Sequence, residues 1–189
     1  MLKDLVYSCR SYRRFYEEVK ISREELKDLV ELARMTASTA NSQALKFKII
    51  DNEADNEKVF ETLGWAGALP DWPGPEAGER PSAYILILED KALGKNKLTD
   101  VGITAQTIML GAVEKGYGGC MLANIRRDNL AEAFAIDPEQ YGIQLVLALG
   151  KPKEEVKVVP VGADGKVAYY RDQNQVHYVP KRSLEEVLI

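Results

Sequence analysis

The sequence predicts a single α/β domain in which helices pack against a sheet of mixed topology. The chain has 189 residues, which is the usual size of one domain. Its composition is 46% apolar and 29% charged, as in an ordinary globular protein. Amphipathic helical segments alternate with short apolar runs along the chain. Because no repeat or linker interrupts them, we expect residues 1–189 to form one domain.

The first third of the chain predicts a helix, a strand and a second helix. Residues 22–36 are expected to be helical because Ser22 and Glu25 have the spacing of a capping box, in which each side chain satisfies a free amide at the helix start. Apolar and charged side chains alternate over 45–50, which predicts a strand. A second helix is expected over 54–63.

A long loop follows at 64–81. It contains four prolines, four glycines and both tryptophans of the chain, Trp65 and Trp72. An ordered loop of this length is uncommon in a compact domain, and such loops often act as lids. We therefore expect this loop to control substrate access, with Trp65 and Trp72 beside the route.

The middle of the chain predicts two buried strands and a long helix. AYILIL at 83–88 and IQLVLALG at 143–150 are continuous apolar runs, which mark strands buried on both faces. Apolar residues at helical spacing predict a helix over 97–115. The glycines at 116–119 are expected to end that helix and begin a short strand. Another helix is expected at about 128–135.

The C-terminal residues predict an exposed hairpin and a short helix. Strands over 166–170 and 176–179 flank the polar segment RDQNQ. Ser183 and Glu186 repeat the capping-box spacing before the last helix. We expect the single histidine, His177, to lie at the surface of this hairpin.

Charge and hydropathy argue against several classes of partner. Lys and Arg number 25 against 29 Asp and Glu, a formal net charge of −4, which does not favour a nucleic-acid surface. No apolar run approaches the ~20 residues that cross a bilayer. The N-terminal residues lack the apolar region of an export signal. We therefore expect a cytoplasmic protein with no nucleic-acid or membrane partner.

Side chains that could carry catalysis by themselves are scarce. Cys9 and Cys120 lie far apart and outside any metal-binding spacing, so neither a disulfide nor a metal site is expected. Cys120 is expected to be a buried apolar thiol. With one histidine, Ser-His-Asp and Cys-His arrangements are all but excluded. Catalysis is therefore expected from a bound group.

Two basic clusters could hold an anion. Arg10, Ser11 and Arg13 lie close together near the N-terminus, and guanidinium forks match the oxygens of a phosphate. Lys181 and Arg182 precede a capped helix start, where free amides also favour an anion. The alternative for each cluster is ordinary solvated surface charge.

A third polar cluster, TASTANSQ at 36–43, lies between the first helix and the first strand. Asn41 and Gln43 each offer a donor and an acceptor on one planar group, which suits the edge of a heterocycle. The alternative is the turn chemistry common at the end of a helix.

Together these segments resemble the nitroreductase-like family of flavoproteins over essentially the whole chain. RSYRRF at 10–15 is similar to the family's Arg-Ser-x-Arg phosphate motif, and ASTANSQALKF at 37–47 to its Pro-Ser-x-x-Asn-x-Gln-Pro-x-x-Phe segment. Residues 100–122 resemble its central helix and the glycine-rich strand that follows. ALGKP at 148–152 and KRSLEEV at 181–187 match its closing signals.

The resemblance implies an α+β fold, a three-layer sandwich with a mixed central sheet flanked by helices. It also implies a homodimer that exchanges its C-terminal extension and binds one FMN per subunit at the interface. Gly102, Ala105 and Gly111 on the helix over 97–115 would let two copies pack closely across a two-fold axis.

The resemblance implies three groups of cofactor contacts. The FMN phosphate and ribityl chain would be held by Arg10, Ser11 and Arg13, joined by Lys181 and Arg182. The flavin of the partner subunit would be reached by Ser38, Thr39, Asn41 and Gln43. Ala123 and Asn124 would lie beside the isoalloxazine ring. Asn124 stands where the family often has glycine, and asparagine tolerates the positive φ that glycine supplies.

The activity implied is an FMN-dependent oxidoreductase that uses NADH or NADPH to reduce an electron-poor small molecule, such as a nitroaromatic, quinone or enone, by a ping-pong mechanism. The flavin carries the hydride chemistry, so no catalytic side chain is expected. Two alternatives stay open. One is another flavin reaction on the same scaffold, such as dehalogenation or flavin cleavage, and the other is a flavin sensor or storage protein without rapid turnover.

Overall fold

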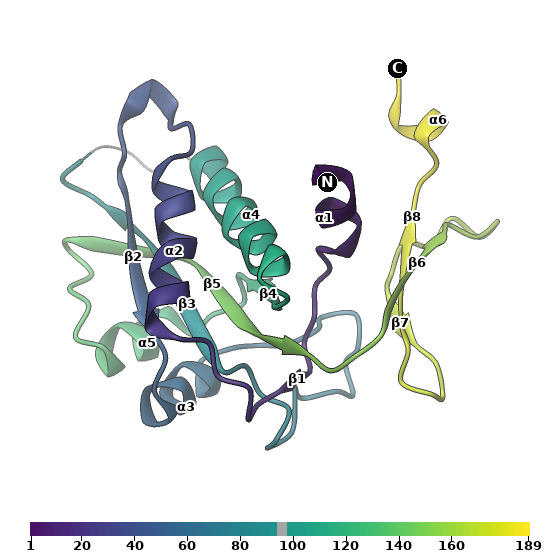
Figure 1. Ribbon diagram of the computed structural model, residues 1–189, viewed down its shortest axis with the longest axis horizontal. Helices are drawn as coiled ribbons and strands as arrows, with labels where there is room; N and C mark the ends of the chain where they lie inside the picture. Colours follow the sequence, from purple (N-terminus) through teal and green to yellow (C-terminus); the bar gives the residue numbers. More distant parts are fainter. Residues whose placement is uncertain (94–97) are drawn as a thin grey trace.

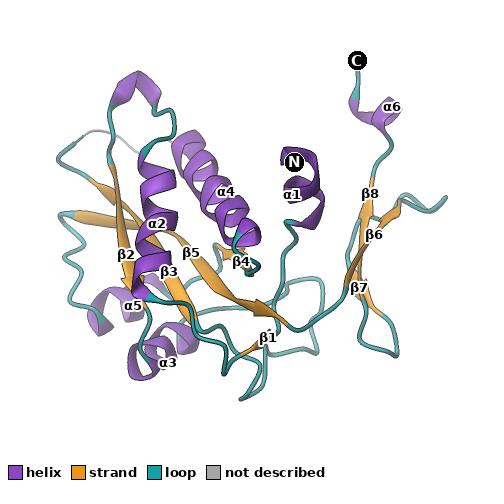
Figure 2. Cartoon of the chain, viewed as in Figure 1, coloured by secondary structure: helices purple, strands orange, loops and turns teal. Residues whose placement is uncertain are grey.

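The computed structural model describes residues 1–93 and 98–189. Its helices are α1 (Leu2–Ser8), α2 (Arg23–Arg34), α3 (Glu53–Glu61), α4 (Leu98–Glu114), α5 (Arg127–Ala133) and α6 (Leu184–Val187). Its strands are β1 (Phe15–Tyr16), β2 (Leu45–Ile50), β3 (Ala83–Asp90), β4 (Gly118–Leu122), β5 (Tyr141–Pro152), β6 (Val156–Pro160), β7 (Tyr170–Arg171) and β8 (His177–Lys181). Figures 1 and 2 show a body of helices around one sheet, with β6, β7 and β8 set to one side.

Strand β5 is the centre of the main sheet. β3 pairs with one edge of β5 along 141–149, and β4 pairs with the other edge along 146–150. β1 pairs with Lys151 and Pro152 at the end of β5. β2 completes the sheet beside β3. All four of these ladders are antiparallel, so the mixed pairing predicted for this sheet is not found between its described strands.

Parallel pairing occurs instead in the small C-terminal sheet, of order β6-β8-β7. There β6 and β8 run parallel, and β7 and β8 antiparallel. An apolar run such as that of β3 indicates burial on both faces of a strand but not the direction of its neighbours. The strand directions therefore could not be read from these runs.

The side chains of β3 alternate between two cores, because successive residues of a strand point to opposite faces. Tyr84, Leu86 and Leu88 face a core that is closed by α3 and α5. Ile85 and Ile87 face a second core that is closed by α2 and α4. All five side chains are buried. The predicted three-layer α+β arrangement is therefore confirmed.

Helices α2 and α4 pack closely on one face of the sheet. The capping box of α2 is present, with the amide of Glu25 donating to Ser22 Oγ at 3.2 Å. A Cβ added to Gly111 would lie 2.6 Å from Cδ1 of Leu32, so this glycine permits the close approach of α2. Ala105 is buried in the same core, and Gly102 faces open space. The small residues of α4 therefore serve packing within the chain at two of their three positions.

Three elements were not predicted: α1, β1 and β6. α1 buries no residue, β6 has no fully buried one, and β1 has only two residues, so none of the three supplies a long buried run. The helix predicted over 97–115 is α4, with Lys97 outside the described residues. The strand predicted over 166–170 is found only at Tyr170. Within 1–93 and 98–189, no helix has the length and apolar character that a membrane crossing requires.

The C-terminal end contributes little to either core. α6 buries no residue, although its capping box at Ser183 and Glu186 is present as predicted. Leu184, Val187 and Ile189 are exposed. Exchange of this extension between subunits stays a prediction.

Candidate functional site

Residues 10–13, the basic segment, lie along the edge of β4. Ser11 forms an isolated parallel bridge with Gly119, and the amide of Tyr12 donates to the Gly119 carbonyl at 2.9 Å. This approach requires glycine in β4, because a Cβ at Gly118 would lie 2.7 Å from Cδ2 of Tyr12. The glycine-rich start of β4 therefore holds the basic segment in place.

Both arginines of the basic segment carry a buried donor without a partner. Arg10 donates from Nη2 to the carbonyl of Val6 at 2.7 Å, and Arg13 from Nη1 to that of Ser11 at 3.3 Å. Their Nε–H groups are buried and find no acceptor among the described residues. An unpaired buried donor costs free energy, and a charge-assisted bond to an anionic oxygen would recover it. The basic segment therefore has the chemistry of an anion site.

Side chains from the C-terminal part of the chain enclose Arg13. We call this group the junction cluster: Arg13, Glu154, Tyr169, Arg171 and His177. Arg13 Nη1 lies 3.5 Å from His177 Nε2, and its guanidinium carbon lies 4.7 Å from the centroid of the Tyr169 ring. Glu154 accepts from the amide of Arg13 and, at 3.0 Å, from Nη2 of Arg171. The side chains of Arg171 and Glu154 are 7% and 0% exposed, so their ion pair is buried.

His177 is 1% exposed, and the expectation that it lies at the surface is therefore wrong. β8 turns it inward, where its ring centroid is 5.1 Å from that of Tyr169. Burial, reinforced by the charges of Arg13 and Arg171, lowers the pKa of His177 to about 4. The histidine is therefore neutral near pH 7. No local pattern could reveal this, because its contact with Arg13 spans 164 positions of sequence.

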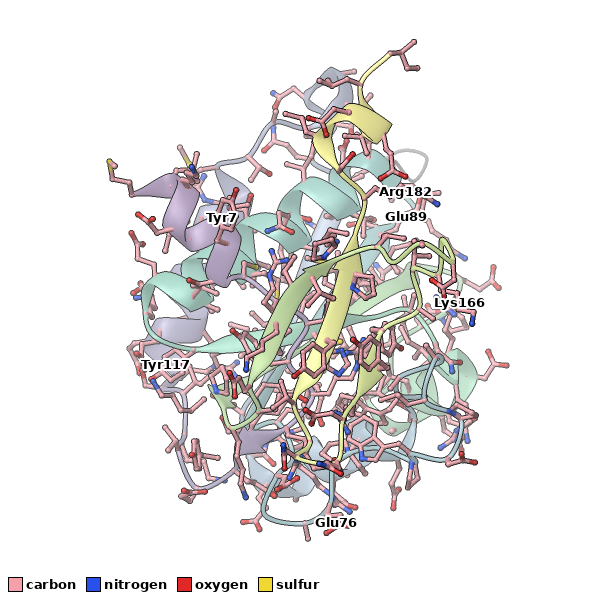
Figure 3. The ribbon with its side chains drawn as sticks, turned by 90° about the vertical axis from the view of Figure 1, so that its right-hand side faces the viewer. Tyr7, Glu76, Glu89, Tyr117, Lys166 and Arg182 are labelled. Carbon is pink, nitrogen blue, oxygen red and sulfur yellow. The ribbon has the colours of Figure 1, made fainter. Side chains whose placement is uncertain are left out.

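Lys181 and Arg182 lie at the far end of β8 from this contact. Arg182 is half-exposed and pairs with Glu186 at 3.4 Å. Figure 3 shows Arg182 just beyond β8, level with the helix α1 that carries Tyr7. A strand rises about 3.3 Å per residue, so Arg182 is roughly 16 Å along the chain direction from His177. Within one chain Arg10, Ser11 and Arg13 lie together, and Arg182 lies just beyond the end of β8 that is away from the contact with Arg13.

The loop at 36–43 is held by a buried carboxylate that sequence reasoning missed. Ser38 Oγ donates to Asp100 Oδ2 at 2.8 Å, and Thr39 Oγ1 donates to Oδ1 at 2.6 Å. The amide of Thr39 also donates to Asp100, and that of Gln43 donates to Ser38 Oγ at 3.0 Å. Asp100 is 4% exposed in the first turn of α4. The available signal was an acidic residue at a predicted helix start, where the helix dipole favours negative charge.

The backbone of this loop is in an unusual conformation. Ala40, Asn41 and Gln43 have φ of 52°, 51° and 49°. The left-handed region costs non-glycine residues about 1–2 kcal/mol each. Such strain persists only where surrounding contacts maintain it, and it concentrates at functional sites. Here the bonds to Asp100 are the contacts that maintain it.

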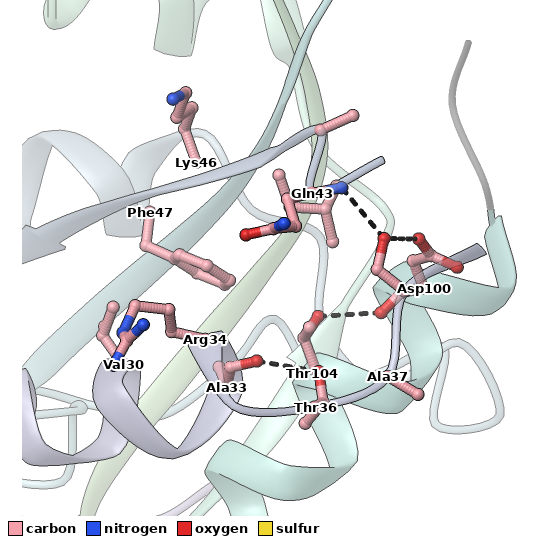
Figure 4. A pocket seen from close by; sticks show the side chains of 13 residues that line it. Val30, Ala33, Arg34, Thr36, Ala37, Gln43, Lys46, Phe47, Asp100 and Thr104 are labelled. Atoms are coloured by element: carbon pink, nitrogen blue, oxygen red, sulfur yellow. Dashed lines mark hydrogen bonds between the residues drawn. The ribbon is translucent and has the colours of Figure 1, made fainter. Parts of the chain in front are cut away.

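A pocket of about 360 Å³ opens between this loop, α2, β2 and α4. Figure 4 shows the amide of Gln43 turned toward Phe47 across it, with Arg34 at its side. Val30 and Ala33 add apolar lining. The pocket therefore combines an apolar wall with a few polar groups, as small-molecule sites do. Asn41 is exposed and lies outside the lining.

Ala123 and Asn124 follow β4 and are exposed. The carbonyl of Asn124 accepts from the amide of Gly64 at 2.9 Å. A Cβ at Gly64 would lie 2.0 Å from Asn124 Nδ2, so the two residues are in close contact. Neither Ala123 nor Asn124 is among the described residues with positive φ, so the left-handed backbone considered for Asn124 is not adopted.

The two tryptophans of the 64–81 loop have different surroundings. Trp65 is 8% exposed, lies in the core closed by α3 and α5, and packs on Phe60 with 5.7 Å between ring centroids. Trp65 therefore belongs to a core in this chain, and its role in access stays a prediction. Trp72 is partly buried under the guanidinium of Arg171, at 4.1 Å. Trp72 therefore places the loop against the junction cluster, and its role in access stays a prediction.

The cysteines show no catalytic environment. Cys120 is 2% exposed within a core, as expected, and burial raises the pKa of its thiol. Cys9 is half-buried, and burial likewise raises the pKa of its thiol. Among the described residues, His, Cys, Asp and Glu form no group of three or more able to hold a metal ion.

Known proteins give a consistent set of similarities. The sequence model of the nitroreductase family matches residues 6–151. The candidate NAD(P)H nitroreductase YdgI of Bacillus subtilis is 26% identical over 185 residues, covering 80% of this chain and 88% of that protein. The Cr(VI) reductase of a Pseudomonas species is 24% identical over 190 residues, covering 94% and 77%. A structure from Desulfovibrio desulfuricans, described as a nitroreductase in complex with FMN, matches with a TM-score of 0.72 at 20% identity and covers 100% of this chain and 95% of that one.

Proposed function

The chain belongs to the nitroreductase family, and on that premise we propose that it is an FMN-dependent oxidoreductase. NADH or NADPH would be the reductant, and an electron-poor small molecule such as a nitroaromatic, quinone or enone would be the acceptor. FMN, when bound, supplies the hydride and electron transfer chemistry. The residues of the chain bind it, orient it and exclude water. Because reductant and acceptor would use one site in turn, ping-pong kinetics are expected.

The observation that carries this proposal is the pair of unpaired Nε–H donors on Arg10 and Arg13. They lie beside Ser11 on a segment fixed against β4. Two guanidinium groups and a hydroxyl are suitable partners for the FMN phosphate. The residues present therefore fit the cofactor, and Lys181 and Arg182 remain proposed as further phosphate contacts.

The 36–43 loop is proposed to contact the flavin ring system of the partner subunit. The hydroxyls of Ser38 and Thr39 donate hydrogen bonds to Asp100, so their oxygens would act as acceptors toward the cofactor. The amides of Asn41 and Gln43 would supply donors. Ala123 and Asn124, exposed after β4, are proposed to lie beside the ring.

A homodimer with exchanged C-terminal extensions is part of the same proposal. The support is apolar surface near both ends of the chain. Leu2 and Tyr7 of α1 are exposed, as are Leu184, Val187 and Ile189 at the C-terminus. A dimer in which these side chains pack against the partner subunit would remove them from water.

Anaerobic titration of the purified, FMN-loaded protein with NADH and with NADPH tests the activity. We expect the oxidised flavin absorbance to bleach and to return when a nitroarene or quinone is added. Parallel lines in double-reciprocal plots would support the ping-pong order. A bound flavin that neither nucleotide reduces would overturn the proposal in favour of a sensor or storage protein.

Mixed dimers test whether the site is shared. An Arg13→Ala chain is combined with an Asn41→Ala chain, and tightly bound flavin is counted per dimer. If each site uses Arg13 of one chain and Asn41 of the other, one site carries both substitutions and one carries neither. About half of the flavin should then bind tightly. A uniform population of weakened sites would refute the shared site.

A further inference from the structure

We propose that His177 is a positioning residue, which fixes the Arg13 guanidinium in the orientation that binds an anion. The inference rests on the proposed role of Arg13 toward the FMN phosphate. His177 is brought to Arg13 from the C-terminal sheet, and no other residue of its type occurs in the chain.

The contacts of Arg13 are gathered on one side of its guanidinium. Nη1 donates to the carbonyl of Ser11 at 3.3 Å and lies 3.5 Å from Nε2 of His177. The ring of Tyr169 covers the planar face at 4.7 Å. The backbone amide of Arg13 donates to the carboxylate of Glu154, which anchors the residue at its base.

The opposite edge of the guanidinium carries Nε–H, which has no partner among the described residues. Nε and Nη2 form the planar fork that takes two oxygens of a phosphate. Contacts on Nη1 therefore set the direction of that fork without occupying it. This is the arrangement expected of a group that holds an arginine ready for a ligand.

The protonation state of His177 follows from its neighbours. Arginine can only donate, so a hydrogen bond between the two side chains requires Nε2 of His177 to accept. The proton then lies on Nδ1, which is buried and has no partner among the described residues. A proton added to His177 would place a positive charge beside Arg13 of the basic segment and Arg171 of β7. The carboxylate of Glu154 is already paired with Arg171. Burial and these two cations keep the pKa of His177 low, so the accepting form is the one present near pH 7.

A merely structural histidine would affect every ligand alike, whereas a positioning residue for Arg13 should affect only ligands that carry the phosphate. We therefore compare the binding of FMN and of riboflavin to the apoprotein of residues 1–189, by quenching of flavin fluorescence. His177→Phe keeps a ring against Tyr169 but removes the acceptor. This substitution should weaken the affinity for FMN about tenfold, the change expected for one hydrogen bond to a charged group. The affinity for riboflavin should stay within twofold of the parent.

Three further variants complete the experiment. His177→Gln places an acceptor near the position of Nε2, so FMN binding should return to within about threefold of the parent. Tyr178→Phe, the neighbour on β8 whose hydroxyl donates to Asp172, should change neither ligand. In an Arg13→Ala background, His177→Phe should cause no further loss of FMN, because the group through which it acts is gone.

Equal weakening of FMN and riboflavin by His177→Phe would overturn the inference, as would no change in either. Should His177→Phe fail to fold, His177→Asn, whose shorter amide cannot reach Arg13, makes the same comparison. If Arg13→Ala itself weakens both ligands equally, the phosphate assignment of the proposed function fails, and this inference with it. If only the Arg13 variant separates the ligands, the proposed function stands and the role of His177 does not.

Discussion

The basic segment and the 36–43 loop are both proposed to hold the cofactor, yet they are built in opposite ways. In the basic segment, Arg10 and Arg13 keep buried donors without partners. In the loop, the donors of Ser38 and Thr39 are satisfied by the carboxylate of Asp100. The basic segment keeps guanidinium donors that have no partner among the residues that the structure describes. The 36–43 loop has a strained backbone that is held by hydrogen bonds within the chain.

This difference separates binding by charge from binding by shape. Unpaired donors near a guanidinium gain most when an anion arrives, because the cost of leaving them unpaired is recovered at that moment. The hydroxyls of Ser38 and Thr39 are already paired, so they gain little from a contact with the cofactor, and their main contribution is to fix the shape of the loop. The basic segment should therefore govern affinity for the phosphate, and the loop should govern folding stability and fit.

The largest effect is expected from Asp100→Ala. Removing this carboxylate leaves the hydroxyls of Ser38 and Thr39 without their acceptor and releases the strained loop. Each hydrogen bond to a charged group is worth about 1.5–3 kcal/mol, so a loss of about 3–4 kcal/mol is expected from the set. Urea unfolding at fixed chain concentration measures it. The control is Asp28→Ala, which removes an exposed partner of Lys115 and should cost under about 1 kcal/mol. Equal losses of stability from the two variants would contradict a stabilising role of Asp100 in the loop.

The junction cluster predicts a pH dependence of the free energy of unfolding, which comes from His177. The pKa of His177 falls from 6.5 when unfolded to about 4 when folded, so the unfolded chain binds the proton more readily. Its contribution is complete above pH 6.5 and is lost as the pH falls toward 4, by up to about 3 kcal/mol. Arg13, Arg171, Glu154 and Tyr169 are the groups that face it.

The contribution of His177 is isolated by comparing the parent with His177→Gln. The free energy of unfolding of each is measured between pH 7 and pH 4.5. The variant should show a flatter profile in that range. Parallel profiles would mean that His177 titrates in the folded state as it does in the unfolded one.

A smaller and more selective effect is expected from Arg13→Ala. Loss of one charge-assisted contact, about 1.5–3 kcal/mol, should weaken FMN about ten- to a hundredfold. Riboflavin should be nearly indifferent, because it lacks the phosphate. Arg23→Ala, which removes an exposed ion pair with Asp51, is the control and should leave both affinities unchanged. Equal losses of FMN and riboflavin affinity in Arg13→Ala would contradict the role of the basic segment in binding the phosphate.

The smallest effect is expected from Ala40→Gly in the loop. Its φ of 52° is costly for alanine, whereas glycine adopts it freely at some entropic cost. The net result should be a gain of about 0.5 kcal/mol in the free energy of unfolding. Ala131→Gly, in the middle of α5, should instead lose about 1 kcal/mol. A loss at both positions would show that the loop conformation is not strained.

Local sequence patterns predicted helices and strands well where their formation depends on residues close in sequence. The capping box of Ser22 and Glu25 and the apolar run of β3 depend on neighbours in sequence, and both were found as expected. The burial of His177 and of Trp65 was not predicted, because it depends on distant residues. These are Arg13 for the first, and the core between β3, α3 and α5 for the second. Asp100 was missed for the same reason, since its partners lie 61 and 62 positions away.

In the candidate site, the residue types were predictable and their arrangement was not. Arg10, Ser11 and Arg13 form one group by proximity in sequence alone, and the structure keeps them together. Arg182 was joined to them by the family resemblance, and in one chain it lies beyond the end of β8 that is away from Arg13. The distance between Arg182 and the basic segment depends on the direction of β8, and the local sequence gives no information on that direction.

The position of β5 has a consequence for how the protein is made. β5 is the strand on which β1, β3 and β4 all pair, and it ends at Pro152. A chain emerging from the ribosome therefore carries the apolar strand β3, some 50 residues earlier, before its partner on that side exists. Non-local strand pairing is slow and leaves apolar edges open to aggregation. Translation speed between β3 and β5 should thus influence the yield of native protein more than speed after Pro152.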